Sequence, residues 1–323
     1  MLVISKKEQE RLVDMREVLS HVETALVAFS NEETQTPIRT SLPFGNGENT
    51  ALYMPSIAEN LKSLGVKVVN VIPRNKSINK KIINGLVLLS DIETGEPQAM
   101  LEGSYITRMR TGALSGVATK YLSRENARTL GIIGTGEQAK GLIAAITVVR
   151  EVEEVLLYNR TQSKAKEFAS FIEEIYDIPT KVVSNANEVI VQSDIIATAT
   201  NASEPVFSTN MKQGAHLNAV GSFRPNMQEI PSSSVISADR LVVESIDAAL
   251  EETGDLMNPI KEGFSSESIV ELGRIINGSQ KGRSTDSEIT VFKSVGLAVI
   301  DIVVGQYILE KARREGMGRE VEL

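Results

Sequence analysis

The chain has 323 residues, enough for about two domains at roughly 150 residues each. Hydrophobic residues make up 41% and charged residues 24%, as in ordinary soluble globular proteins, so extensive disorder and collagen-like or low-complexity structure are excluded. Lys and Arg number 34 against 42 Asp and Glu, and the net charge of -8 argues against binding nucleic acid or an anionic membrane. The expected ligand is a small molecule.

The chain contains no cysteine, which excludes disulfides, thiolate nucleophiles, Cys-ligated zinc and iron–sulfur clusters. Its two histidines, His21 and His216, are far apart in the sequence and predict no metal site, although an all-carboxylate magnesium or calcium site stays open. We assign neither a catalytic role and expect His216 to be a hydrogen-bonded core residue. The first residues lack the apolar core of a secretory signal, and the apolar stretch at 295–309 is too short to span a bilayer, so we expect a cytoplasmic protein.

The first part of the chain predicts helices and an antiparallel sheet. Apolar residues at helical spacing predict one amphipathic helix over residues 8–30. Strands are predicted at residues 51–55, 66–73 and 85–92. Turn-forming residues at 93–97 predict a hairpin, and a helix follows over 105–122, where small residues indicate close approach of another backbone.

After residue 126, strands and helices alternate. Strands are predicted at 129–133, 154–158, 181–183, 195–198, 216–220 and 240–243, with helices between them that end at 149, 176 and 192. This rhythm predicts an α/β fold with a Rossmann-type doubly wound parallel sheet over residues 123–296. A last helix over 291–314 is expected to return to the first domain, so a second α+β domain is built from both chain ends, 1–122 and 297–323.

A glycine-rich turn follows the strand at 129–133 at once. Its spacing is that of the dinucleotide-binding motif G-x-G-x-x-A, and a helix comes next. Gly134 permits the tight turn, Gly136 lets the backbone approach a pyrophosphate, and Ala139 keeps the helix close to the sheet, while Thr135 and Gln138 complete the loop. The alternative is a βα turn without a ligand.

The next strand ends in Asn159, Arg160 and Thr161, where NAD sites place an acidic residue on the ribose 2′-hydroxyl. No acid stands here. Asn159 suits a hydroxyl, whereas Arg160 and Thr161, with Lys164, suit a 2′-phosphate, so NADPH is favoured and NADH stays possible. The alternative is that Arg160 is a solvated residue at the helix start and Thr161 is its N-cap.

Two further strands end in small or polar residues at the edge of the sheet where such folds bind ligands. These residues suit the nicotinamide ribose, although Ala199 and Gly221 could equally be packing residues. The candidates are Thr198, Ala199, Thr200, Val220, Gly221 and Ser222.

Three basic residues of the first domain are candidates for binding a carboxylate. Lys67 shares a strand face with Val69 and Val71, so it either meets a ligand carboxylate or protects an edge strand from aggregation. Arg39 lies in a loop, and Arg110 lies beside the small residues of the 105–122 helix, where a helix start favours an anion. Composition alone makes each arginine a surface residue.

Six motifs, in order, make the sequence similar to the ornithine cyclodeaminase and μ-crystallin family over nearly the whole chain. They are Pro37-Ile38-Arg39, residues 65–69, residues 108–113, the glycine-rich turn at 134–139, residues 218–221 and residues 292–296. The resemblance implies a homodimer formed through the β-rich domain, which also binds substrate. It further implies an NAD(P)H-binding Rossmann domain and a substrate with a carboxylate beside an amine or imine.

The same resemblance gives roles to individual residues. It implies that Arg39, Lys67 and Arg110 bind the substrate carboxylate. We further predict that Lys67 is catalytic and that Arg110, Thr111 and Ser294 contribute to the cofactor site. Ornithine cyclodeaminases place an Asp where this sequence has Phe223, which argues against cyclodeamination.

We therefore predict reduction of a cyclic α-imino acid, Δ1-pyrroline-2-carboxylate to L-proline, with the six-membered Δ1-piperideine-2-carboxylate to L-pipecolate as a further reaction. Ornithine cyclodeaminase or alanine dehydrogenase activity is the alternative. A third possibility is a non-catalytic NADPH-dependent binding protein like μ-crystallin.

Overall fold

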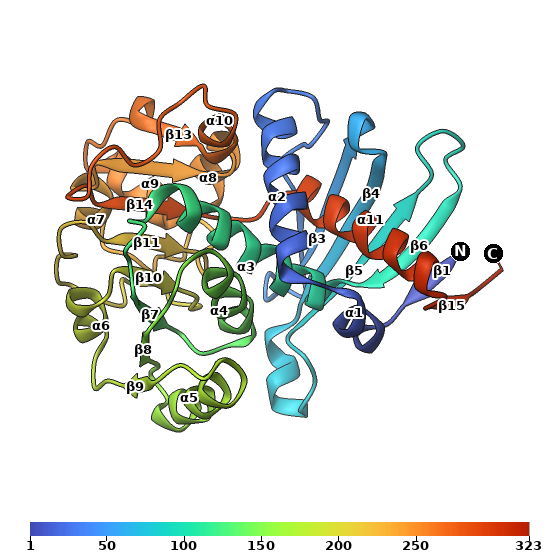
Figure 1. Cartoon of the computed structure of the whole chain (residues 1–323). Coiled ribbons are helices and arrows are strands. Elements are labelled where there is room, and N and C mark those ends of the chain that lie inside the picture. The colour runs from blue at the N-terminus through green and yellow to red at the C-terminus, as the bar shows by residue number, and fades with distance from the viewer. Residues whose placement is uncertain (323) are drawn as a thin grey trace. The chain divides into compact units, whose positions relative to one another are not determined.

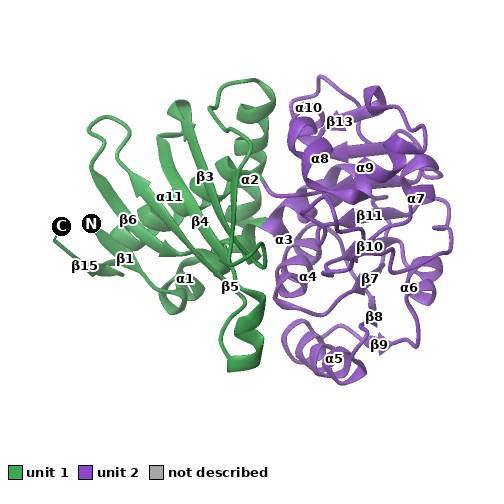
Figure 2. Cartoon of the chain, turned by 180° about the vertical axis from the view of Figure 1, so that it is seen from behind, with its two compact units in different colours: residues 1–110, 297–323 green, residues 111–296 purple. Residues whose placement is uncertain are grey.

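The computed structural model describes residues 1–322 (Figure 1). The chain divides into two compact units, which Figure 2 shows in different colours: unit 1 comprises Met1–Arg110 and Leu297–Leu323, and unit 2 comprises Thr111–Gly296. The boundary between Gly296 and Leu297 coincides with the domain boundary proposed from the sequence. The other boundary lies at residue 110, inside a helix, rather than at residue 122 where that helix ends.

Unit 1 contains a seven-stranded mixed sheet in the order β15-β1-β6-β5-β4-β3-β2. Neighbouring strands are antiparallel except for β1 and β6. The strands are β1 (Leu2–Ile4), β2 (Thr40–Phe44), β3 (Asn49–Ala58), β4 (Ser63–Val71), β5 (Ile83–Ser90), β6 (Pro97–Glu102) and β15 (Arg319–Glu320). The predicted hairpin is confirmed as β5 and β6. Because β4 lies between β3 and β5, the edge-strand interpretation of Lys67 is wrong.

The helices of unit 1 begin with α1 (Lys6–Leu12) and α2 (Met15–Ser30). The single helix predicted over 8–30 is therefore wrong, because Asp14 caps a new helix by accepting a hydrogen bond from the Arg16 amide at 2.7 Å. Helix α11 (Ala298–Glu315) packs against α2, β3, β4 and β5, so the end of the chain returns to the first domain as expected. Two short 3-10 helices, η1 (Glu59–Leu61) and η2 (Pro73–Ile78), flank β4.

Helix α3 (Gly103–Leu122) contains the division between the units. Its small residues permit the close packing that the sequence predicts, because a Cβ on Gly112 would lie 2.1 Å from the carbonyl oxygen of Gly141. Arg110 lies in the second turn of α3, so the expectation that it stands at a helix start is wrong: the helix already begins at Gly103.

Unit 2 contains an eight-stranded, fully parallel sheet in the order β13-β12-β14-β11-β10-β7-β8-β9. Its strands are β7 (Thr129–Ile133), β8 (Glu154–Tyr158), β9 (Thr180–Val182), β10 (Ile195–Thr198), β11 (His216–Ala219), β12 (Arg240–Val243), β13 (Ile269–Glu271) and β14 (Thr290–Lys293). Its helices are α4 (Glu137–Val149), α5 (Gln162–Tyr176), α6 (Ala186–Gln192), α7 (Ser232–Ile236), α8 (Ile246–Glu252), α9 (Gly254–Lys261), α10 (Leu272–Ile276) and η3 (Ser266–Ser268).

The strand order confirms a doubly wound sheet. The chain moves outward from β7 in one direction through β8 and β9 and then restarts on the other side at β10. In such folds ligands bind at the carboxyl ends of the strands beside this switch point. The predicted last helix over 291–314 is wrong at its start, because Thr290–Lys293 is the buried strand β14 and a short apolar run fits either structure.

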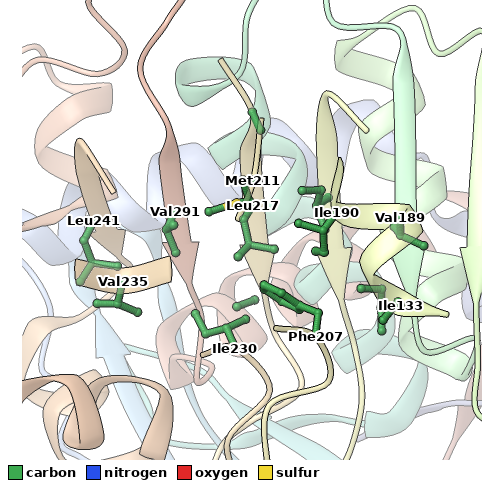
Figure 3. Close-up of a cluster of buried hydrophobic side chains, with 14 of the residues drawn as sticks. Ile133, Val189, Ile190, Phe207, Met211, Leu217, Ile230, Val235, Leu241 and Val291 are labelled. Carbon is green, nitrogen blue, oxygen red and sulfur yellow. The ribbon is translucent and has the colours of Figure 1, made fainter. Parts of the chain in front are cut away.

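Apolar side chains cover both faces of the parallel sheet. Figure 3 shows one face, where Ile133, Leu217 and Val291 from three strands meet Val189 and Phe207. Leu130 and Ile132 point to the other cluster, which includes the buried side of α4. The carboxyl ends of β7, β10 and β11 are therefore held by a core on each side. No helix of the described chain is long and apolar enough to cross a membrane.

Candidate active site

The turn after β7 has the geometry that the dinucleotide motif requires. Gly134 has φ of +93°, a conformation that favours glycine, and a Cβ there would lie 2.7 Å from the carbonyl oxygen of Ala199. Gly136 is the N-cap of α4 and no side chain caps the helix there. A Cβ on Gly136 would have no heavy atom within 4 Å, so the space above the first amides of α4 is open. Ala139 is fully buried against the sheet.

Two side-chain atoms of this turn are buried without a hydrogen-bond partner: Thr135 Oγ1 and Gln138 Oε1. Buried polar atoms normally have partners, so such orphans at an open helix N-terminus fit a site that is completed by a ligand. A dinucleotide supplies phosphate and ribose oxygens for such atoms. The residues present therefore fit a nicotinamide cofactor.

The residues after β8 lie beside this turn. Asn159 Oδ1 accepts a 3.4 Å hydrogen bond from the Thr135 amide, and Asn159 Nδ2 donates to the Thr161 carbonyl at 2.9 Å. Thr161 is the N-cap of α5, but its side chain makes no capping bond. The side chains of Arg160 and Lys164 are exposed, and neither forms an ion pair within residues 1–322. Three groups that suit a phosphate are therefore free to bind one.

The residues after β10 and β11 are joined by one buried carboxylate, Glu229. Its Oε1 accepts from the Thr200 amide at 2.5 Å, and its Oε2 accepts from the amides of Gly221 at 2.5 Å and Ser222 at 3.1 Å. Thr198 donates its hydroxyl to Oε2 at 3.2 Å. Glu229 therefore fixes two of the predicted cofactor loops to each other, and sequence reasoning missed it.

Close packing of backbone accompanies this carboxylate. A Cβ on Gly221 would lie 2.2 Å from the carbonyl oxygen of Thr200. The hydroxyl of Ser222 is fully buried and bonds the Met227 carbonyl at 2.8 Å and the Thr253 hydroxyl at 2.6 Å. Ala199, Thr200 and Val220 stay partly exposed at the strand ends. Of these candidates, Thr198 and Ser222 use their side chains within the protein, so they would meet a ligand only through their backbones.

A second buried charged pair, Lys293 and Asp255, lies next to Glu229. Lys293 Nζ lies 2.8 Å from Asp255 Oδ2 and donates to the Ser222 carbonyl at 2.7 Å. Asp255 Oδ1 accepts from the amides of Glu229 at 2.7 Å and Ile230 at 3.1 Å. Burial raises the pKa of Glu229, with Lys293 opposing the shift and Asp255 adding to it. Because four donors surround its two oxygens, we treat Glu229 as ionised.

The remaining cofactor candidates of unit 2, Thr111 and Ser294, are buried. Ser294 donates its hydroxyl to Glu244 Oε1 at 3.0 Å, and the same oxygen accepts from the amides of Val295 at 2.7 Å and Gly296 at 2.5 Å. Its side chain is therefore held by Glu244, a second buried acid that sequence reasoning missed. Thr111 lies on α3.

Unit 1 holds a buried charged cluster made of Lys67, Arg110 and Asp301. Lys67 comes from β4, Arg110 from α3 and Asp301 from the first turn of α11, and their exposed fractions are 2%, 6% and 0%. Lys67 Nζ lies 2.7 Å and Arg110 Nε lies 3.0 Å from the same oxygen, Asp301 Oδ1. The other oxygen, Oδ2, is buried without a hydrogen bond.

Burial and neighbouring charges shift the pKa values of Lys67 and Asp301 in the charged cluster. Burial lowers the pKa of Lys67 to about 8, with Asp301 opposing the shift and the positive charges of Arg110 and Arg39 adding to it. Burial would raise the pKa of Asp301, but Arg110 and Lys67 outweigh it and hold that pKa below its ordinary value. Arg39 is half-buried before β2, and its influence on Lys67 places its charge near the cluster.

The structure thus brings together the three basic residues proposed from the sequence and adds an acid that was missed. The signal for Asp301 was present, because it is a lone carboxylate inside an apolar stretch. Such a residue is buried only when it is paired. Arg110 keeps its terminal nitrogens Nη1 and Nη2 free of hydrogen bonds to the described residues, since its hydrogen bond to Asp301 uses Nε. This edge of the guanidinium is suited to a carboxylate.

His216 is fully buried and its Nδ1 lies 2.9 Å from the Thr290 hydroxyl, and burial together with Arg283 lowers its pKa to about 3, so it is a neutral core residue. His21 is half-buried and packs against Tyr307, with ring centroids 4.8 Å apart and the ring planes tilted by 37°. Within residues 1–322 no group of three or more His, Cys, Asp or Glu side chains could hold a metal ion.

Comparison with known proteins gives consistent matches over the whole chain. The sequence model of the ornithine cyclodeaminase/mu-crystallin family matches residues 1–316. A Delta(1)-pyrroline-2-carboxylate reductase of Bacillus cereus (strain ZK / E33L) is 60% identical over 324 residues, covering 100% of both chains.

Two solved structures are also similar. The Thermococcus litoralis Delta(1)-pyrroline-2-carboxylate reductase, in complex with NADH and L-proline, is 40% identical with a TM-score of 0.96, covering 99% of this chain and 100% of that chain. An archaeal alanine dehydrogenase dimer with bound NAD is 31% identical with a TM-score of 0.94, covering 100% and 99%.

Proposed function

The chain belongs to the ornithine cyclodeaminase/mu-crystallin family, and from this premise we propose that it reduces Δ1-pyrroline-2-carboxylate to L-proline with a reduced nicotinamide cofactor. It is an oxidoreductase that acts on a C=N bond. The imine carbon gains a hydride and the imine nitrogen a proton, while the cofactor is oxidised. Full-length similarity to reductases of this substrate carries the proposal. We include Δ1-piperideine-2-carboxylate, which has the same carboxylate and imine on a larger ring, as a further substrate.

The charged cluster suits the substrate carboxylate. Because Asp301 occupies Nε of Arg110, the two terminal nitrogens of the guanidinium are left to hold both carboxylate oxygens. Lys67 has three donors and gives one to Asp301, so it can bond the same carboxylate. Arg39 adds a third positive charge. The cluster would thereby fix the substrate and leave its C=N bond in a defined orientation.

We also propose a catalytic role for Lys67. Its pKa of about 8 lies close to neutral pH, so its ammonium group can lose and regain a proton under ordinary conditions. Lys67 Nζ would hold the proton that the imine nitrogen takes up. An ordinary lysine, with its pKa of 10.5, would be a weaker acid for this step.

The cofactor site is proposed in unit 2. When bound, NADPH or NADH supplies the hydride. The turn with Gly134, Thr135, Gly136 and Gln138 and the N-terminus of α4 would hold the pyrophosphate. Ala199, Thr200, Val220 and Gly221, with backbone groups of Thr198 and Ser222, would line the nicotinamide ribose. Thr111 and Ser294 complete the proposed site in unit 2.

We propose a preference for NADPH over NADH. The free side chains of Arg160, Thr161 and Lys164 suit a 2′-phosphate, and the strand end before them lacks the acid that would repel it. The Thermococcus relative, in contrast, is described with NADH. Asn159 permits NADH here as a second cofactor.

We further propose a homodimer formed through unit 1. Its edge strand β2 is exposed along its whole length, and large apolar side chains stand exposed on this part of the sheet: Leu42, Phe44, Tyr53, Ile83 and Leu86. Exposed apolar groups on an edge strand favour a protein partner. The dimeric alanine dehydrogenase supports a second copy as that partner. Light scattering on the purified protein tests this assignment.

The function is tested by a panel of substrates with NADPH and NADH. Δ1-Pyrroline-2-carboxylate should be reduced fastest, and Δ1-piperideine-2-carboxylate should be a second substrate. Pyruvate with ammonia tests the alanine dehydrogenase alternative, and ornithine with NAD tests cyclodeamination, which the half-buried Phe223 argues against. Cofactor binding without turnover of any substrate would contradict the proposal and favour a binding protein.

A further inference from the structure

We propose that Asp301 is a positioning residue for imine reduction: its single oxygen Oδ1 aligns the Arg110 guanidinium and keeps Lys67 in its charged form for the substrate. This inference rests on the proposed function. Asp301 would act through Arg110 and Lys67 rather than on the substrate itself.

The alignment of Arg110 follows from the shape of its side chain. A guanidinium is planar and rigid, so a hydrogen bond from Nε to a fixed acceptor determines where both terminal nitrogens point. Asp301 Oδ1 is such an acceptor, at 3.0 Å, and it is fixed in turn by the first turn of α11. Within residues 1–322, Asp301 Oδ1 accepts the hydrogen bond that the Arg110 side chain donates. Without it, the guanidinium would be free to rotate away.

The charge on Lys67 depends on the same carboxylate. The charged groups that face Lys67 are Arg110 from α3, Arg39 from the segment before β2, and Asp301 from α11. The strands on either side, β3 and β5, contain no charged residue. Asp301 is therefore the acid that offsets two guanidinium groups and burial, and a helix N-terminus helps it to stay ionised.

The composition of the charged cluster argues against a purely structural role for Asp301. Its Oδ2 is buried without a hydrogen bond, so one side of the carboxylate is unsatisfied within the described residues. Burying three charged side chains in one place also costs folding free energy, which a well-packed apolar group would avoid. Buried charges and unsatisfied polar atoms that reduce stability are found mainly at functional sites.

The test compares the pH dependence of kcat/KM for Δ1-pyrroline-2-carboxylate in the wild type and in Asp301→Asn. Removing the negative charge lowers the pKa of Lys67, and since the charged form is needed, activity must be lost at lower pH than in the wild type. We expect kcat/KM to fall at least ~10-fold near pH 8 and ~3-fold or less near pH 6. All proteins meet the same substrate at each pH, so its own titration cancels.

Two variants serve as controls. Glu310→Gln removes an exposed carboxylate from the same helix and should keep the wild-type profile. Asp301→Glu keeps the charge and should keep the pH at which activity is lost, even if KM rises. If Asp301→Asn does not fold, judged by its unfolding temperature and cofactor binding, Asp301→Ser provides a smaller uncharged replacement.

The outcomes separate this inference from the proposed function. If the wild type does not reduce the imine, the proposed function fails. If the wild type is active and Asp301→Asn is unchanged, or loses the same factor at every pH, the inference is overturned. Recovery of the uncharged variant at low pH supports it, because a merely structural defect would not be reversed by protons.

Discussion

The cofactor turn of unit 2 and the charged cluster of unit 1 are built in opposite ways. The turn is a contiguous run, Gly134 to Ala139, and it is proposed to bind the cofactor through backbone amides and the space that missing side chains leave. The charged cluster consists of Lys67, Arg110 and Asp301, which are far apart in the sequence, and it is proposed to bind the substrate through buried charges, with the half-buried Arg39 adding to them.

This difference has a practical consequence. A site built from backbone amides tolerates many side-chain changes and is lost mainly when a glycine is replaced by a residue with a side chain. A side-chain site fails when any one charge is removed, because the remaining charges are then buried without their partner. The two regions should therefore respond separately to mutation, one in the KM for the cofactor and the other in the kinetics of the imino acid.

The largest effect is expected from Arg110→Ala. Loss of a two-point, charge-assisted contact should lower kcat/KM for Δ1-pyrroline-2-carboxylate about 300-fold, corresponding to ~3 kcal/mol. The dissociation constant for NADPH should change little, as measured by fluorescence titration. The matched control is Arg108→Ala, two residues earlier on α3, where the arginine pairs with Glu10 at 3.6 Å and stacks on Tyr105. Equal losses in both variants would contradict the assigned role of Arg110.

Substituting the glycines of the turn after β7 should impair the proposed cofactor site of unit 2. Gly136→Ala places a methyl group where the protein leaves open space, so the unfolding temperature should stay unchanged while NADPH affinity falls about 100-fold. Gly134→Ala meets backbone and has a left-handed φ, so it should lose both stability and affinity. Unchanged cofactor affinity in Gly136→Ala would show that the pyrophosphate lies elsewhere.

The third prediction concerns Glu229, which joins the two strand-end loops. In Glu229→Gln an amide NH2 replaces one acceptor oxygen and faces backbone N–H donors, so the loops must separate. We expect the KM for NADPH to rise about 30-fold and stability to fall by ~2 kcal/mol. The KM for the imino acid at saturating NADPH should stay near the wild-type value; a rise confined to that KM would refute the assignment.

The smallest effect is expected from Arg160→Ala. The side chain is exposed, so solvent screens its contact with a 2′-phosphate, and the KM for NADPH should rise only about tenfold. The KM for NADH should not change, because NADH lacks this phosphate. Steady-state kinetics with both cofactors give the ratio, and an equal rise for both would mean that Arg160 does not bind the phosphate.

Sequence patterns predicted the strand, turn and helix of the proposed cofactor site well because their signals are local. The strand at 129–133, the glycine spacing and the following helix all lie within 21 residues and coincide with β7, the turn and α4. The buried acids Glu229 and Glu244 escaped prediction, since their partners are backbone amides of other loops. The helices between β12 and β14 were missed because they have only five to eight residues, and because α9 begins at Gly254 and contains Pro259.

Only part of the charged cluster could be predicted from the sequence: Lys67 and Arg110 were proposed, and Asp301 was missed. The strand period placed Lys67 on a buried face, but it left an edge strand equally possible, and the interior position of β4 decides between the two. The partner of Lys67 is 234 residues away, on a helix that local patterns began too early. Long-range pairing of this kind depends on the strand order and on the return of α11, which no local spacing encodes.

The most direct measurement uses cofactor deuterated at nicotinamide C4 together with Δ1-pyrroline-2-carboxylate, with the product analysed by mass spectrometry and NMR. The account predicts L-proline that carries one deuterium at C2, formed in equal amount to the oxidised cofactor. Proline without deuterium, or cofactor oxidation without proline, would contradict the assignment of this chain as an imine reductase.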